Sequence, residues 1–122
     1  MIKNEKSTIN GKEYITSLFP AVPAYLLARK LISVFTVADG NYADKLCAID
    51  PDGELMLELL SQTTVDGTGI NKAVFNSMYS GNLSEAFMAV VFVIKVNFPD
   101  FLGEGKVEAL SQEITQLFPE KK

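Results

Sequence analysis

The sequence predicts a mainly α-helical fold, a small helical bundle with a short N-terminal β-hairpin. Apolar residues recur at three- and four-residue spacing through most of the chain, which is the period of amphipathic helices. One Asn-Gly pair, Asn10-Gly11, separates two short β-prone stretches near the start, as in a tight hairpin. With 122 residues, 48% of them hydrophobic, the chain is long enough to form a core without disulfides or metals. We expect a single domain over residues 1–122, with the hairpin at 8–16 and a helical body at 20–118.

The hairpin and one long helix come first. Asn-Gly favours a two-residue type I′ turn, because both residues tolerate a positive φ. Pro20 and Pro23 then precede a helix predicted for residues 24–37, which ends at Asp39-Gly40. Seven residues form its broad apolar face: Tyr25, Leu27, Ala28, Leu31, Ile32, Val34 and Phe35.

Shorter elements follow in the middle of the chain. An amphipathic helix is expected at 42–49. Asp50-Pro51 then supplies an N-cap and a proline suited to the first position of a helix that ends near Gln62. Residues 63–69 indicate an extended segment with a turn. Asn71 is expected to cap the short helix that comes next.

The most apolar segment is predicted to be a helix over residues 83–97. Asn82 and Glu85 match a capping box, which marks a helix start. The competing interpretation is a buried strand, because residues 90–94 are rich in β-branched and aromatic side chains. The apolar run is too short to cross a bilayer. This helix is either the centre of the bundle or a surface for self-association or client binding. A last helix is predicted at 107–118.

Composition excludes several classes of function. The chain has no histidine, which removes Ser-His and Cys-His nucleophile pairs and His-ligated zinc. Cys47 is the single cysteine, so no disulfide can form within the chain. A net charge of −4 without a basic cluster argues against nucleic acid as a partner. The polar N-terminus does not resemble a secretory signal, so the cytoplasm is the expected compartment and a membrane is not an expected partner.

No set of residues in the sequence matches a known catalytic or cofactor motif. The segment Asp50 to Gly53 fails as a calcium loop, because alanine and leucine stand where the first and last ligands belong. The fragment Gly67-Thr68-Gly69 lacks the rest of a nucleotide-binding motif. The pair Glu54 and Glu58 is typical of a solvated helix face, and Cys47 is expected to be an inert thiol in the core. We therefore expect no enzyme activity, no cofactor and no metal.

Taken in order, the motifs resemble those of the tail assembly chaperones of long-tailed bacteriophages and their prophages. The most distinctive motif is an Asn-Phe-x-x-Phe sequence after the long apolar helix. The segments that carry the resemblance are Ile9-Asn10-Gly11-Lys12-Glu13-Tyr14, Leu18-Phe19-Pro20-Ala21, Leu27-Ala28-Arg29-Lys30-Leu31, Thr64-Val65-Asp66-Gly67, Phe75, Tyr79-Ser80-Gly81-Asn82 and Val96-Asn97-Phe98-Pro99-Asp100-Phe101.

The resemblance implies a non-enzymatic protein that binds the tape measure protein, keeps it soluble and helps to recruit tail tube subunits. It also implies action in the host bacterial cytoplasm, absence from the mature virion and self-association of the copies. The positions carried over as candidate protein-binding residues are Phe75, Tyr79, Phe98 and Phe101. The alternative for these aromatic residues is that they anchor turns to the core.

Two other functions remain open at this stage. A permanent phage component, such as a head-tail connector or a tail completion protein, would also be small, helical and without a catalytic set. A small enzyme with carboxylate chemistry is the third hypothesis, and it lacks a visible set of converging acids and bases.

Overall fold

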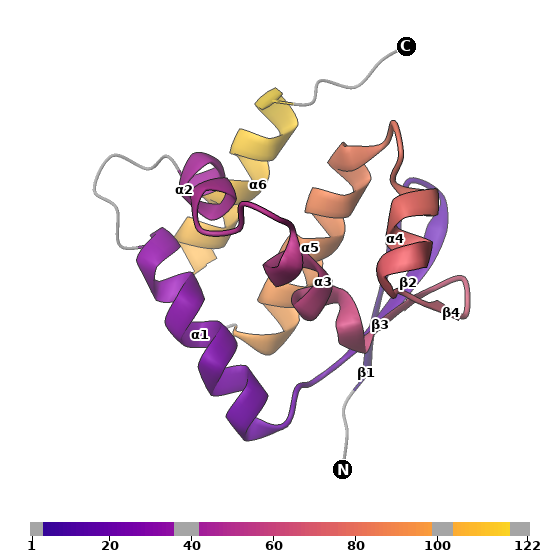
Figure 1. Cartoon of the computed structure of the whole chain (residues 1–122), viewed down its shortest axis with the longest axis horizontal. Coiled ribbons are helices and arrows are strands. Elements are labelled where there is room, and N and C mark those ends of the chain that lie inside the picture. Colours follow the sequence, from indigo (N-terminus) through magenta and orange to yellow (C-terminus); the bar gives the residue numbers. More distant parts are fainter. Residues whose placement is uncertain (1–3, 36–41, 99–103, 118–122) are drawn as a thin grey trace.

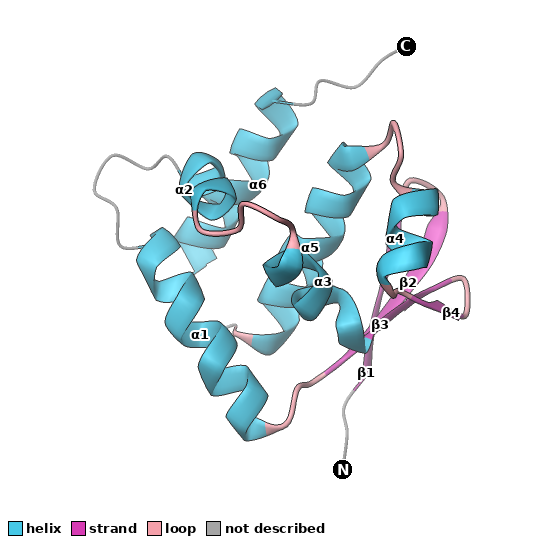
Figure 2. Ribbon diagram, in the orientation of Figure 1, coloured by secondary structure: helices cyan, strands magenta, loops and turns pink. Residues whose placement is uncertain are grey.

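The structure is a computed structural model that describes residues 4–35, 42–98 and 104–117 (Figure 1). Its strands come in two consecutive pairs along the chain, each pair followed by a group of helices (Figure 2). They are β1 (Asn4–Ile9), β2 (Lys12–Ser17), α1 (Ala21–Phe35), α2 (Tyr42–Ala48), α3 (Glu54–Leu59), the 3₁₀ helix η1 (Leu60–Gln62), β3 (Thr63–Val65), β4 (Thr68–Gly69), α4 (Lys72–Met78), α5 (Leu83–Asn97) and α6 (Glu104–Leu117).

The strands form one antiparallel sheet in the order β1-β2-β3-β4. Asn10 and Gly11 have φ values of 54° and 79°, so both central residues of the first turn have the positive φ of a type I′ turn. The predicted turn is confirmed. Each strand of this hairpin extends beyond the expected 8–16 boundaries. Asp66 and Gly67 repeat the positive-φ pair at the turn between β3 and β4.

The prediction of a mainly α-helical bundle with only a hairpin is wrong. The extended segment at 63–69 supplies β3 and β4, and β3 pairs with β2 to make a four-stranded sheet. This pairing joins residues about fifty positions apart, such as Thr16 with Thr63. Sequence periodicity reports local conformation and not which distant strand is the partner, so the larger sheet was not visible in it. The fold is therefore a helical layer packed on an antiparallel sheet.

Most helices lie close to their predicted positions. The helix over 83–97 is confirmed, and the alternative of a buried strand at 90–94 is excluded. Helix α1 begins at Ala21, three residues before the predicted start. Pro23 is tolerated inside its first turn, because the first backbone N–H groups of a helix have no partner within it. Helix α6 (Glu104–Leu117) begins three residues before the predicted start at 107, and the predicted last residue, Phe118, lies outside the described residues.

Capping is partly as predicted. The Oδ1 atom of Asn71 accepts a hydrogen bond of 2.9 Å from the backbone N–H of Val74, so this cap is confirmed. Asp50 also caps a helix, but it does so from a distance. Its carboxylate accepts hydrogen bonds from the N–H groups of Leu55 and Met56, at 2.8 and 3.1 Å. Pro51 lies in the intervening turn and not at the first helical position, as had been predicted.

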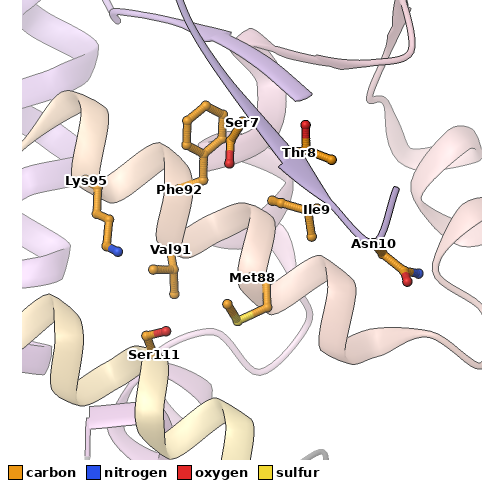
Figure 3. Close-up of a pocket in the computed structure, with 9 residues that line it drawn as sticks. All are labelled: Ser7, Thr8, Ile9, Asn10, Met88, Val91, Phe92, Lys95 and Ser111. Atoms are coloured by element: carbon orange, nitrogen blue, oxygen red, sulfur yellow. The ribbon is translucent and has the colours of Figure 1, made fainter. Parts of the chain in front are cut away.

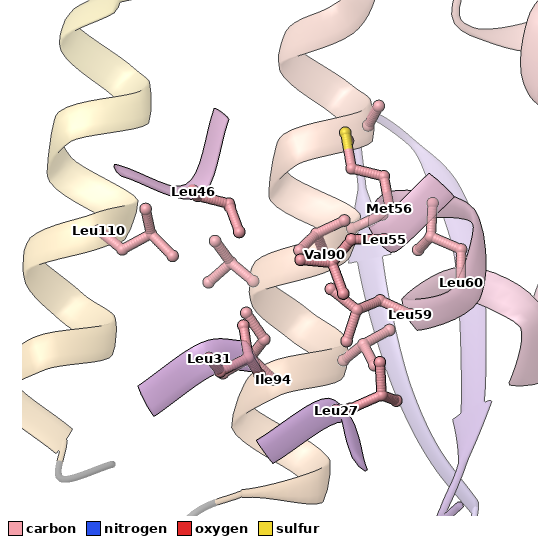
Figure 4. Packing of buried hydrophobic residues seen from close by; sticks show 14 of the residues in the cluster. Leu27, Leu31, Leu46, Leu55, Met56, Leu59, Leu60, Val90, Ile94 and Leu110 are labelled. Atoms are coloured by element: carbon pink, nitrogen blue, oxygen red, sulfur yellow. The ribbon is translucent and has the colours of Figure 1, made fainter. Parts of the chain in front are cut away.

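Helix α5 is the centre of the hydrophobic core. It contacts β1 and β2 on one side and α3, η1 and α6 on others (Figure 1). Its apolar side chains pack with leucines from α1, α2, α3 and α6 (Figure 4). The apolar surplus of α5 therefore serves the core, as the first of the two interpretations expected. No helix within the described ranges is long and apolar enough to cross a membrane.

Cys47 does not lie in the core, and the prediction of an inert core thiol is wrong in its location. The side chain is exposed on α2, while the neighbouring Leu46 is buried. Successive residues of a helix point about 100° apart, so an apolar neighbour in sequence need not share its environment. Partial desolvation, with Asp44 and Asp50 nearby, raises the pKa of the thiol.

Replacing Asp50 with alanine should lower the free energy of unfolding by about 1 kcal/mol, the usual cost of a lost helix cap. The substitution leaves the N–H groups of Leu55 and Met56 without their acceptor. Urea denaturation measures the change. Asp52→Ala is the matched control, because Asp52 is exposed in the same turn. Equal losses in the two variants would show that Asp50 acts only through its charge.

Candidate functional site: an exposed apolar stripe and a buried carboxylate

Helix α1 carries apolar side chains on two opposite faces. Leu27, Leu31 and Val34 form the face that is buried in the core. The other face carries four exposed residues, which we call the α1 stripe: Val22, Tyr25, Leu26 and Ile32, with exposed fractions of 69, 63, 45 and 42%. The spacing of these residues places them along one side of the helix. Tyr25 and Ile32 belong to the broad apolar face predicted from the sequence, but they lie on the exposed side of the helix.

The α1 stripe is an unusual surface for a small protein. Single exposed apolar residues are common, but a contiguous set indicates a binding site for another apolar surface. Helix α1 lies at the periphery of the molecule, on the side away from the sheet (Figure 1). Arg29 is exposed within the same side of the helix. The next residue, Lys30, forms an exposed ion pair of 3.3 Å with Glu58.

The segment that leads into α1 is fixed to the end of α5. The backbone N–H of Phe19 donates a hydrogen bond of 2.9 Å to Oδ1 of Asn97. Asn97 in turn donates from Nδ2 to the backbone carbonyl of Val93, at 3.3 Å. Leu18, directly before this anchor, is also exposed and extends the apolar surface towards the sheet. The stripe is therefore presented on a helix whose start is positioned by the core.

Phe75 and Tyr79, two of the aromatic residues predicted as protein-binding positions, lie in a different part of the structure. Phe75 and Tyr79 of the α4 region pack edge to face, with ring centroids 5.0 Å apart. Tyr79 and Phe98 are buried, and Phe75 is half-buried against the core. Phe101 lies outside the described residues. The structure brings Phe75 and Tyr79 together but not with Phe98, and a role of these residues in client binding stays a prediction.

Tyr79 belongs to a buried polar cluster around Glu85, which we call the Glu85 junction. Oε1 of Glu85 accepts hydrogen bonds from Nδ2 of Asn10 and of Asn82, at 2.9 and 2.8 Å. Tyr14 donates its hydroxyl proton to Oε2. A carboxylate can only accept, so the 2.8 Å bond between the two tyrosine hydroxyls must run from Tyr79 to Tyr14.

Lys12 completes the junction with an ion pair of 3.2 Å to Glu85. The carboxylate is almost fully buried, whereas the lysine side chain is one third exposed. The predicted capping box is therefore wrong. Asn82 does occupy the N-cap, but its side chain contacts Glu85 and no helix N–H. The one indication of this cluster in the sequence was Glu85, a single acidic residue in an apolar helix. Nothing in the sequence identified its distant partners.

The junction sets the ionisation of its members. Burial alone would raise the pKa of Glu85, but hydrogen bonds from Tyr14, Asn10, Asn82 and Lys12 stabilise the carboxylate and hold its pKa below the ordinary 4.5. Desolvation is the main cause that raises the pKa of the Tyr14 hydroxyl, and its hydrogen bond to Glu85 adds to this. Glu85 is thus charged and both tyrosines are neutral at neutral pH.

Helix α1 and the Glu85 junction define a class of protein. The junction is internally satisfied and positions secondary structure, while the α1 stripe leaves apolar side chains exposed to solvent. These features are typical of an interaction protein that holds apolar surface of a partner.

Comparison with known protein families agrees with an interaction protein. The family model described as "Phage tail assembly chaperone protein, TAC" matches residues 48–111, just over half of the chain. The chain belongs to this phage tail assembly chaperone family. The match includes α3 to α5 and the Tyr79, Asn82 and Glu85 side of the junction, and it does not include α1. No curated protein and no solved structure matches the chain.

Replacing Glu85 with glutamine should lower the free energy of unfolding at pH 7 by about 2–3 kcal/mol, because charge-assisted hydrogen bonds are lost. The pKa of Glu85 is depressed in the folded state, so its stabilisation is present above the unfolded value near 4.5 and is lost as pH falls through the lower folded value. The difference in the free energy of unfolding between wild type and Glu85→Gln should therefore become smaller as pH is lowered below about 4.5. Urea denaturation at several pH values measures it.

Glu13→Gln is the matched control for this prediction, because Glu13 is an exposed carboxylate on β2, on the face opposite the junction residue Tyr14. It should change stability little, within about 0.5 kcal/mol. A gap between wild type and Glu85→Gln that stays constant down to acidic pH would contradict the assigned ionisation of Glu85.

Proposed function

We propose that this protein binds the tape measure protein during tail morphogenesis, keeps it soluble and helps to recruit tail tube subunits around it. It acts without catalysis in the host bacterial cytoplasm and leaves before the virion is complete. The observation that carries the proposal is the α1 stripe, together with membership of the tail assembly chaperone family.

The chemistry of the client suits such a surface. A tape measure is a long, largely helical chain whose apolar stripes stay exposed until the tube has formed. An exposed helix with an apolar side can pack against such a stripe in the manner of two helices in a coiled coil. The contact buries apolar area on both partners, which would otherwise promote aggregation.

Release has to follow binding, so each contact should be weak. Many copies bound along one client hold it through effective concentration, and self-association between copies adds to this avidity. Tube subunits that compete for the same stripe then displace the copies by mass action. A permanent component of the virion would instead stay bound, so finding the chain in purified virions by mass spectrometry would contradict the proposal.

Replacing Val22, Tyr25 and Leu26 together with serine should abolish the solubilising effect. Co-expression of the tape measure protein with wild type should leave most of it in the soluble fraction, and the triple variant should leave most of it in the pellet. Each lost apolar contact that contributes about 1.4 kcal/mol weakens binding tenfold. Because the three residues are exposed, the variant itself should remain folded.

Leu83→Ser is the matched control, because Leu83 is equally apolar and half exposed but lies at the start of α5, away from the stripe. It should solubilise the tape measure protein as well as wild type does. Full activity of the triple variant, with circular dichroism confirming its fold, would exclude α1 as the client surface.

A further inference from the structure

A groove lies beside β1, on the side of the molecule formed by the sheet and the last two helices (Figure 3). Its volume is about 370 Å³. Met88, Val91 and Phe92 of α5 form an apolar floor, and Ser7 to Asn10 form the wall along β1. This groove is separate from the α1 stripe and has no role in the function proposed above.

Strand β1 presents unpaired backbone along this groove. It is an edge strand of the sheet. Ile9 and Lys12 close a two-residue turn and therefore form a hydrogen-bonded pair, and such pairs alternate along an antiparallel ladder. Thr8 and Lys6 then belong to non-hydrogen-bonded pairs, so their N–H and C=O groups point away from β2. Among the described residues, none pairs with these groups.

We propose that this groove binds an extended peptide segment of a partner protein, which adds to the sheet as an antiparallel strand beside β1. Backbone hydrogen bonds to Lys6 and Thr8 hold the segment. Alternate side chains of a strand point to the same face, so every second residue of the guest lies over the floor and must be apolar.

Charge selects one end of the guest. Lys95 is the only titratable side chain that lines the groove in the described part of the chain, and the protein as a whole carries a net charge of −4. Its ion pair with Glu108, at 3.0 Å, is exposed on both sides and weak enough to exchange. Lys95 lies at the end of the groove opposite the Asn10 turn (Figure 3). The C-terminal end of an antiparallel guest reaches it and should be acidic.

A second copy of the chain is a poorer guest. The face of β1 that would lie over the floor carries Glu5 and Ser7 next to Ile9, so only one of the three is apolar. Two registers of equal overlap pair the outward-facing backbone groups of two antiparallel β1 strands. One sets Lys6 opposite Lys6, and like charges in that position are destabilising. The other sets Ser7 opposite Ser7, which adds no apolar contact.

The test uses a fluorescein-labelled peptide, Val-Thr-Val-Thr-Val-Thr-Asp, in which the three valines and the Asp share one face, and measures its binding to the whole protein by fluorescence anisotropy. Amide resonances of Lys6 and Thr8 should shift in ¹⁵N spectra when it binds. Val-Val-Val-Thr-Thr-Thr-Asp has the same composition without the alternation, and it should bind at least about tenfold more weakly.

Two variants of the protein locate the site. Thr8→Pro removes the N–H group that faces the guest peptide, and it leaves the N–H groups that pair with β2 in place. The hairpin should therefore persist, while the affinity for the alternating peptide falls about tenfold. Lys95→Glu should weaken binding of the peptide that ends in Asp and strengthen binding of a peptide that ends in Lys. Lys72→Glu, an equal charge change at an exposed site on α4, should leave both affinities unchanged.

Three outcomes would overturn the inference: no saturable binding of the alternating peptide, shifts confined to α1, or dimerisation through β1 in sedimentation experiments. None of these bears on binding of the tape measure protein by the α1 stripe, so the two proposals fail separately.

Discussion

The buried carboxylate of Glu85 is the interaction on which the rest of the structure depends. It joins the first hairpin to the end of α4 and the start of α5, which lie 65 to 75 positions further along the chain. A buried charge is costly unless it is paired and fully hydrogen-bonded. The hydrogen bonds to Glu85 can all form only when these segments are arranged as they are in the structure. The junction therefore sets how the sheet lies on the central helix. It also accounts for the polar residues in two of the motifs that resemble tail assembly chaperones.

Helix α1 contributes to the core and also carries the α1 stripe. The inner face of α1 packs in the core, and its start is held by the hydrogen bond from Phe19 to Asn97. The outer face is then free to remain apolar without loosening the fold. This separation explains how a chain of 122 residues can both fold and keep apolar side chains exposed. Buried aromatic residues such as Tyr79 and Phe98 contribute to the first task.

Features that depend on neighbouring residues were predictable from the sequence. The Asn10-Gly11 turn, the Asn71 cap and the helix over 83–97 were each correctly inferred from a local pattern. The β2-β3 pairing and the partners of Glu85 were not, because they join residues roughly 50 to 75 positions apart. The α1 stripe was missed for another reason: periodicity shows that a helix face is apolar, but it does not tell which of two apolar faces meets the core.

Amide hydrogen exchange of the complex with the tape measure protein tests the central claim most directly. Peptides that cover α1, residues 21–35, should exchange more slowly in the complex than in the free protein. The exchange rate of peptides that cover α2 should be the same in both. Slower exchange confined to α4 and the end of α5, with α1 unaffected, would contradict the account and would point to the aromatic residues instead.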